Sequence, residues 1–262
     1  MHTLTVMRTY IKLGFLNMVQ YRANFFFELL GVVTHLTTAF LGLSLVFNQT
    51  NSLNGWSGTE IVILVGIQTM IGGIVGTVIQ PSFQQFMEHV RLGTLDFTLT
   101  KPADSQVIVS LQRINGGAIA GIVAGFLTLS FGVSRQASSI GIAEASLFLI
   151  TLTAGIVIVY CFLLMLTTFT FWFLKLDNVL VIFETSFGHA GSWPITIYPG
   201  WLKAGLTFIV PVAFAVTVPA ESLTGRQDTT WIVGTIVAAL IFAVASRRFW
   251  RFGLKHYTGA SA

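Results

Sequence analysis

Long apolar segments separated by short polar ones dominate the pattern along the chain. A helix needs about 20 apolar residues to cross the roughly 30 Å hydrocarbon core of a bilayer. Six segments come close to or exceed that length, at residues 25–47, 61–80, 114–134, 145–173, 179–197 and 231–249. The fifth is the weakest, because it contains Glu184, His189 and Pro194. The pattern predicts an all-α integral membrane protein with six transmembrane helices.

A further apolar run, residues 205–218, is too short for a straight crossing and is broken by Pro211. Irregular backbone at membrane depth is tolerated only where protein covers its polar groups. We therefore expect a re-entrant or interfacial hairpin between the fifth and sixth spans. The alternative, a seventh span, would move the basic cluster at residues 247–255 to the outer side, which disfavours it.

The basic residues predict the orientation. With six spans, both termini and two of the five loops share one side of the membrane. That side holds eleven basic residues: Arg8, Lys12, Arg22, Arg91, Lys101, Arg113, Lys175, Arg247, Arg248, Arg251 and Lys255. The other side holds three, namely Arg135, Lys203 and Arg226. Because Lys and Arg are in excess on the cytoplasmic side of membrane proteins, both termini are expected to be cytoplasmic.

Composition agrees with a lipid environment. Only 9% of the 262 residues are charged and the mean hydropathy is +0.79, whereas soluble domains carry about 25% charged residues. A soluble enzyme, a secreted disulfide scaffold and a disordered protein are therefore excluded. The basic residues flank the predicted spans, so we expect no nucleic-acid partner despite a pI near 9.5. Tryptophans near the predicted span ends suggest an aromatic belt: Trp56, Trp172, Trp193, Trp201, Trp231 and Trp250.

One transmembrane domain, residues 1–262, accounts for the whole chain. Within residues 1–22, apolar side chains recur at three- and four-residue steps, and Arg8 and Lys12 lie one turn apart. This spacing predicts an amphipathic helix on the cytoplasmic surface of the bilayer. A simple juxtamembrane tail is the alternative.

The most informative polar stretch is residues 88–106, EHVRLGTLDFTLTKPADSQ, between the second and third spans. Leu92, Leu95 and Leu99 repeat at helical spacing, and Lys101-Pro102 would stop the helix. The spacing predicts a short amphipathic helix parallel to the membrane, suited to docking a cytoplasmic partner. An ordinary polar loop fits the same residues.

This stretch resembles the second cytoplasmic signature of ABC-2 type permeases, the membrane subunits of a class of ATP-binding-cassette exporters. The likeness rests on Arg91, Gly93-Thr94-Leu95-Asp96, Leu99 and Pro102, and on a layout close to the short permeases without a large extracellular domain. The resemblance implies that residues 88–106 contain the coupling helix and that residues 1–22 form the elbow helix. It implies ATPase docking through Arg91, Leu92, Gly93, Thr94, Leu95, Asp96, Leu99, Lys101 and Pro102.

Four of the six prolines fall between residues 194 and 219. The segment 194–220 resembles the re-entrant helices that close the outer mouth in the same family. The resemblance implies an outer gate made by Pro194, Tyr198, Pro199, Trp201, Pro211 and Pro219. A bent outer loop anchored at the interface by its aromatic residues is the alternative.

The chain itself is not expected to be an enzyme. It has no Gly-x-x-x-x-Gly-Lys-Ser/Thr sequence to cradle ATP, no catalytic residues that suggest themselves, and no histidine or cysteine pair at metal-ligand spacing. The resemblance implies a separate nucleotide-binding ATPase that holds ATP and Mg²⁺, and a second permease subunit, identical or related. It also implies export of a hydrophobic or amphipathic substrate through a lipid-embedded complex of the cell inner membrane.

Intramembrane ionisable groups are costly and therefore candidates for function. Glu184 is the best candidate for a residue on the substrate path, where it would contact a cationic substrate. The alternative is a structural role, in which Glu184 bonds to a neighbouring helix. His189 lies about 140° around the helix from it, so the two do not share a face. His35 suits a helix-to-helix hydrogen bond, and Glu28 an ion pair with Arg22. The rival function is an ion- or proton-coupled secondary transporter that uses Glu184. An integral-membrane enzyme would need a polar catalytic cluster that the sequence does not offer.

Overall fold

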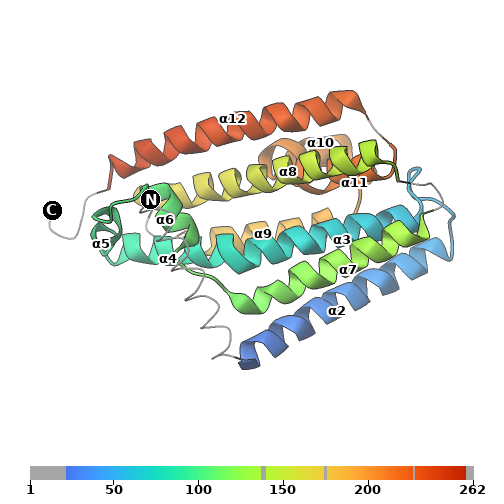
Figure 1. Cartoon of the computed structure of the whole chain (residues 1–262), viewed down its shortest axis with the longest axis horizontal. Helices are drawn as coiled ribbons and strands as arrows, with labels where there is room; N and C mark the ends of the chain where they lie inside the picture. The colour runs from blue at the N-terminus through green and yellow to red at the C-terminus, as the bar shows by residue number, and fades with distance from the viewer. Residues whose placement is uncertain (1–21, 137–139, 174–175, 227, 258–262) are drawn as a thin grey trace.

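The computed structural model describes residues 22–136, 140–173, 176–226 and 228–257 (Figure 1). The predicted elbow helix at residues 1–22 therefore lies almost wholly outside the described residues. The longer elements are α2 (Arg22–Phe47), α3 (Gly58–Ile74), α4 (Gln80–Arg91), α7 (Ile119–Arg135), α8 (Ile142–Thr168), α9 (Asp177–Gly191) and α12 (Thr229–Leu254). The shorter ones are η1 (Val75–Ile79), α5 (Asp96–Leu99), α6 (Ser105–Leu111), η2 (Gly116–Ala118), η3 (Phe169–Phe171), η4 (Ile195–Ile197), α10 (Gly200–Ala204), η5 (Gly205–Ile209), η6 (Ala213–Thr217) and α11 (Val218–Leu223).

The all-helical prediction is confirmed for the described part of the chain, and the long helices run side by side with α12 and α2 at opposite edges (Figure 1). Five helical segments are long and apolar enough to cross a membrane: Phe25–Phe47, Gly58–Arg91, Gly116–Arg135, Ile142–Phe171 and Thr229–Leu254. They coincide with the first four predicted spans and the sixth.

The fifth predicted span, residues 179–197, is only partly correct. Helix α9 has 15 residues, about 22 Å of helix, and it ends at Gly191, before Pro194. The chain then continues through the short turn η4 to the loop that precedes α3, where the Asn54 Nδ2 donates to the Thr196 carbonyl at 2.7 Å. A short helix followed by irregular backbone is therefore found where the sequence predicted a single transmembrane helix.

The apolar run after α9 forms two short helical segments bent by 79°, Gly200–Ile209 and Ala213–Leu223, with Pro211 at the break. Both ends of this hairpin meet residues 54–60, which comprise the end of the loop before α3 and the first turn of α3. Asn54 bonds Thr196 before the hairpin, and Arg226 bonds Glu60 after it, with Nε 2.6 Å from Oε1. The chain therefore enters and leaves the hairpin at one end of the bundle. Re-entry into the membrane stays a prediction, which this placement favours.

The second span is longer than predicted. Gly58–Arg91 is continuous over 34 residues, about 51 Å, against about 30 Å of hydrocarbon. The π-helical turn η1 precedes Pro81, which lies at the start of α4. A π-turn re-registers the backbone hydrogen bonds where proline has no N–H to give. The excess length carries α4 beyond a bilayer, to the end of the bundle where α5, α6, η3 and the last turns of α12 gather, which we call the basic end.

Glycines let α3 and α7 approach closely. A Cβ added at Gly73 would lie 2.4 Å from the Ile122 backbone nitrogen, and one at Gly125 would lie 2.3 Å from that of Met70. Small residues permit such backbone-to-backbone packing of membrane helices. Packing within the chain therefore accounts for these glycines.

The predicted tryptophan belt is wrong at two positions. Trp250 is fully buried, with its ring 5.1 Å from Phe86 and 5.7 Å from Phe171, and its Nε1 donates to the Ser105 hydroxyl at 3.3 Å. Trp56 is buried beneath the Arg226 guanidinium. Both rings pack protein segments together instead of facing lipid.

Candidate functional site

The predicted coupling segment lies at the basic end, but it is not one helix. Helix α4 ends at Arg91, and Gly93 adopts a left-handed φ of +67° that a side chain would disfavour. The Thr94 N–H then bonds the His89 carbonyl at 2.9 Å. Only one turn of helix, α5, follows. The prediction of a single amphipathic helix through the three leucines is therefore wrong.

The break also separates the leucines. Leu95 is fully buried, Leu99 is partly buried, and Leu92 is 58% exposed. Phe97, which the sequence analysis overlooked because it lies off the leucine spacing, is 76% exposed. The segment therefore exposes Leu92 and Phe97 at its surface, while Leu95 holds the segment in the core.

The other predicted docking residues lie on the same segment with graded exposure. Arg91, Asp96, Lys101 and Pro102 are exposed, whereas Gly93 and Thr94 are partly buried. Arg91 lies 3.9 Å from Glu88, one turn earlier on α4, in a half-exposed ion pair. Such a half-exposed pair contributes little to the stability of the fold.

A polar network ties the segment to two long helices. Arg247 of α12 pairs with Asp104, its Nη1 lying 2.9 Å from Oδ1, and also donates to the Gln106 Oε1 at 2.8 Å. Gln106 in turn donates to the Tyr160 hydroxyl of α8 at 3.1 Å, and Ser110 lies 2.8 Å from that hydroxyl. The Arg247 guanidinium lowers the pKa of Asp104. Charge counting had assigned Arg247 only to orientation, so this anchoring role was missed.

The gate candidates divide between surface and core. Trp201 is 77% exposed and Pro199 is exposed, whereas Pro194, Pro211 and Pro219 are buried. Tyr198 is half-buried and donates to the Ala190 carbonyl at 3.3 Å. Burial raises the pKa of the Tyr198 hydroxyl. The returning arm of the hairpin packs against α8, where a Cβ at Gly155 would lie 2.8 Å from the Ala215 Cα.

Arg226 fastens the hairpin at its far end. Besides the Nε bond, its Nη2 lies 2.8 Å from the Glu60 Oε2 and bonds the Gly55 carbonyl, and its guanidinium lies 5.1 Å from the centre of the Trp56 ring. Bidentate arginine–carboxylate pairs are among the stronger polar contacts in proteins. We call this arrangement, together with the Asn54–Thr196 bond, the hairpin clasp. Nothing in the sequence except the charges of Glu60 and Arg226 indicated that these residues would meet.

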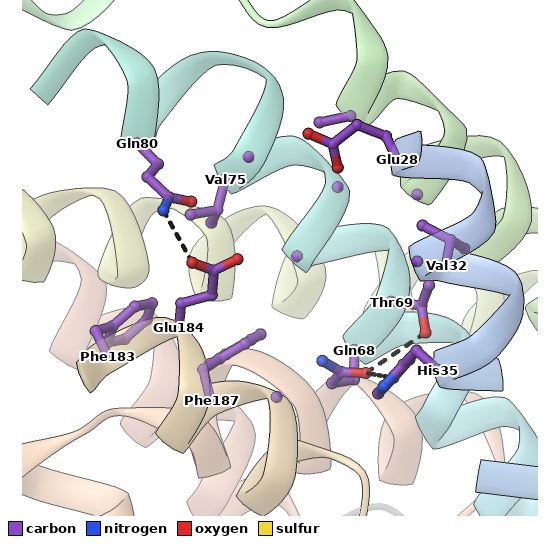
Figure 2. A pocket seen from close by; sticks show the side chains of 17 residues that line it. Glu28, Val32, His35, Gln68, Thr69, Val75, Gln80, Phe183, Glu184 and Phe187 are labelled. Atoms are coloured by element: carbon purple, nitrogen blue, oxygen red, sulfur yellow. Dashed lines mark hydrogen bonds between the residues drawn. The ribbon is translucent and has the colours of Figure 1, made fainter. Parts of the chain in front are cut away.

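A pocket of about 270 Å³ opens between α2, α3, η1 and α9 (Figure 2). Glu184, the predicted substrate-path residue, lines it and accepts a hydrogen bond from the Gln80 Nε2 at 2.9 Å. Figure 2 shows Phe183 and Phe187 on the same helix, with Glu28 and His35 on α2 across the pocket. His189 is not among the lining residues, in agreement with its predicted separate face.

His35 and Glu28, the two ionisable groups of α2 named above, also line this pocket. His35 makes the predicted helix-to-helix bond, its Nε2 lying 3.3 Å from the Gln68 Oε1. Glu28 accepts from the Asn115 Nδ2 at 3.1 Å, while the Arg22 side chain lies outside the described residues. Since Glu28, His35 and Glu184 belong to helices far apart in sequence, their shared pocket was not apparent from the chain.

The chain matches a family model described as ABC-2 family transporter protein over residues 33–261. It belongs to this family. Curated proteins give no match. The predicted membership of the ABC-2 family is thereby confirmed.

Membership makes the chain an integral-membrane, transmembrane component of an ABC transporter, a non-catalytic subunit of a family that implies an ATPase partner. Within the described ranges, no group of three or more His, Cys, Asp or Glu side chains is placed to hold a metal ion. Three features of this ABC-2 protein are candidates for a role in transport: the predicted coupling segment at one end, the clasped hairpin at the other, and the pocket between them.

Proposed function

We propose that this ABC-2 family protein is the permease subunit of an ATP-driven exporter of a hydrophobic or amphipathic substrate. A separate nucleotide-binding subunit binds ATP and Mg²⁺ and docks on residues 88–106. One observation carries the docking proposal. The second span runs about 51 Å, well past the bilayer thickness, and ends in a segment that exposes Leu92 and Phe97. Two exposed apolar side chains at the end of a membrane bundle, beyond the lipid, are suited to pack against the surface of a partner protein.

Helix α8 supports a mechanism for transmission. Its Tyr160 bonds the coupling segment through Gln106 and Ser110, and its Gly155 contacts the hairpin at Ala215. A continuous helix moves as one body over this short distance. When ATP draws two nucleotide-binding subunits together, displacement of the coupling segment therefore reaches the hairpin through α8, and through α12 at Arg247.

The hairpin is the proposed outer gate. Its prolines place irregular backbone at the bend, and burial of residues 211–220 against other helices covers that backbone, as re-entry into a membrane requires. The hairpin clasp holds both ends of the hairpin to residues 54–60. Export requires the gate to open, so the clasp loosens when α8 moves.

A second permease subunit, identical or related, completes the proposed path. Only 6% of the residues in the most apolar stretch of α2 are buried within the chain, and the pocket beside α2 is open. The basic end faces the cytoplasm in the proposed orientation, in the cell inner membrane. Glu184 in the pocket is also the feature that an ion-coupled secondary transporter would need, and this remains the alternative function.

The test is isolation of the complex from its native membrane with gentle detergent. The double variant Leu92→Ala/Phe97→Ala is compared with Phe252→Ala, which truncates a 51% exposed phenylalanine of α12 at the same end. Loss of an ATP-binding subunit in the double variant alone supports the proposal. Retention of the ATPase in both variants contradicts the docking site, and its absence from the wild-type complex favours the secondary transporter.

A further inference from the structure

We infer that the pocket between α2, α3 and α9 binds an organic cation with an apolar body, so that the substrate class is a cationic amphiphile. The inference rests on the proposed transport function and specifies the substrate of the same path. It is carried by the charge of the pocket, the depth of its polar groups and the aromatic residues beside them.

The pocket carries negative charge without a cation. Its lining includes the carboxylates of Glu28 and Glu184, and no lysine or arginine lies among its described lining residues. The partners of both carboxylates there are amide groups, from Asn115 and Gln80. Carboxylates at membrane depth are costly unless they are paired. A bound cation supplies that pairing.

The polar groups lie at two depths. Gln80, beside Glu184, is 22 positions along the second span from Gly58, and Glu28 is 19 positions from Phe47, or about 33 and 28 Å along their helices. Both carboxylates therefore lie near the inner limit of the hydrocarbon core, where a cation from the cytoplasmic side arrives first.

Gln68 lies deeper, about 15 Å from Gly58, and is only 5% exposed. Its Oε1 accepts from Thr69 at 3.4 Å and meets the His35 ring, but its Nε2 has no acceptor among the described residues. This nitrogen is not among the fully enclosed polar atoms of the described residues, because Gln68 borders the pocket. This amide is therefore placed to donate to a polar atom of a ligand whose charged group sits at the carboxylates.

The remaining lining is aromatic or small. Phe183 and Phe187 stack with ring centres 5.4 Å apart on the α9 side of the pocket (Figure 2). Aromatic faces attract cations as well as apolar groups. A volume of about 270 Å³ suits a compact amphiphile, near the small end of ligand pockets. Because the described residues offer no three-ligand metal site, an organic cation fits better than a metal ion.

The test uses trimethylphenylammonium and benzenesulfonate, two compact aromatic ions of similar size and opposite charge. Equilibrium binding is measured on the purified full-length chain in lipid nanodiscs without the ATPase, with empty nanodiscs as background. We expect specific binding of the cation only. Glu184→Gln keeps a group able to accept from Gln80 and should weaken cation binding by about tenfold, because it removes the charge of the exposed Glu184 carboxylate. Glu144→Gln, at the start of α8 and outside the pocket, should leave it unchanged.

A second variant tests the location without altering charge. A Cβ at Gly188 meets nothing within 4 Å, and Gly188 lines the pocket, so Gly188→Leu fills it and should abolish binding. Equal binding of both ions, or cation binding unaffected by Glu184→Gln and Gly188→Leu, overturns the inference. The ATPase is absent from this assay, so a lack of cation binding would not contradict the docking proposal. Likewise, a failure of the docking experiment would not change the interpretation of the binding assay.

Discussion

The packing of α3 against α7 makes a quantitative prediction at Gly73. A Cβ there would lie 2.4 Å from the Ile122 nitrogen and 2.7 Å from the Gly121 carbonyl carbon, whereas ordinary contacts begin at 3.4 Å. Both obstructing atoms are backbone, so the helices must separate locally by about 1 Å. Overpacking of this kind costs about 1–3 kcal/mol, and the higher helix propensity of alanine returns up to about 1 kcal/mol. Gly73→Ala should therefore lower the free energy of unfolding by about 1–2 kcal/mol.

Gly72→Ala is the matched control. It makes the same chemical change one residue earlier in α3, where the added Cβ meets only the Gln68 Nε2, at 4.0 Å. This variant should be as stable as the wild type or more stable by up to about 1 kcal/mol. Stability is measured by dodecyl sulfate titration of the protein in mixed micelles, followed by circular dichroism. Equal stability of the two variants would refute the close α3–α7 contact.

Three further predictions address the two ends of the bundle. Arg226→Met removes the Arg226 contacts of the hairpin clasp and leaves the Asn54–Thr196 bond, so we expect faster hydrogen exchange in residues 200–223 and a decrease of about 1–3 kcal/mol in the free energy of unfolding; unchanged exchange would contradict the role of Arg226 in the clasp. Because Arg247 lowers the pKa of Asp104, their pairing is complete above the ordinary carboxyl pKa of about 3.9 and is lost as pH falls through the lower, folded value. Exchange in residues 88–106 should thus stay low at pH 5 and rise only below the ordinary carboxyl pKa of about 3.9, and Asp104→Asn should abolish this step. Leu95→Ala should destabilise by about 2–4 kcal/mol and Leu92→Ala by less than about 0.5 kcal/mol in the same unfolding titration, and equal effects would contradict their assigned burial.

Hydropathy predicted most of the fold because lipid forces backbone polar groups into helices. Five of the six apolar runs are long helices for that reason. The run at residues 179–197 differs because protein covers its irregular end. The Asn54 side chain donates a hydrogen bond to the Thr196 carbonyl, and Pro194 is buried. Apolar composition alone therefore did not reveal where α9 ends.

The periodic spacing of leucines in the coupling segment led to a wrong prediction for a local reason. The spacing of Leu92, Leu95 and Leu99 describes a helix only if the backbone stays right-handed throughout. Gly93, directly after the basic last turn of α4, adopts φ +67° and ends that helix, a common role for glycine. The location of the segment was predictable from the sequence, and the identity of its exposed side chains was not.

The pocket could not be predicted from the sequence, because its residues come together only in the tertiary structure. Glu184 was selected because a charge in a span is costly, which is visible in one segment. Its neighbours Glu28 and His35 come from α2, and Gln68 and Gln80 come from α3 and α4. Which faces of these helices meet is decided by packing contacts such as those of the glycines between α3 and α7, which a single sequence does not specify.

The central claim is that a nucleotide-binding subunit docks at the coupling segment. Its most direct test is photo-crosslinking in native membranes with Phe97 replaced by p-benzoylphenylalanine, and with Phe252 replaced in the same way as the control. The account predicts a crosslink from position 97, and not from position 252, to a protein that carries a Gly-x-x-x-x-Gly-Lys-Ser/Thr motif. Crosslinks from position 97 to lipid alone, or to proteins without an ATP-binding motif, would contradict it.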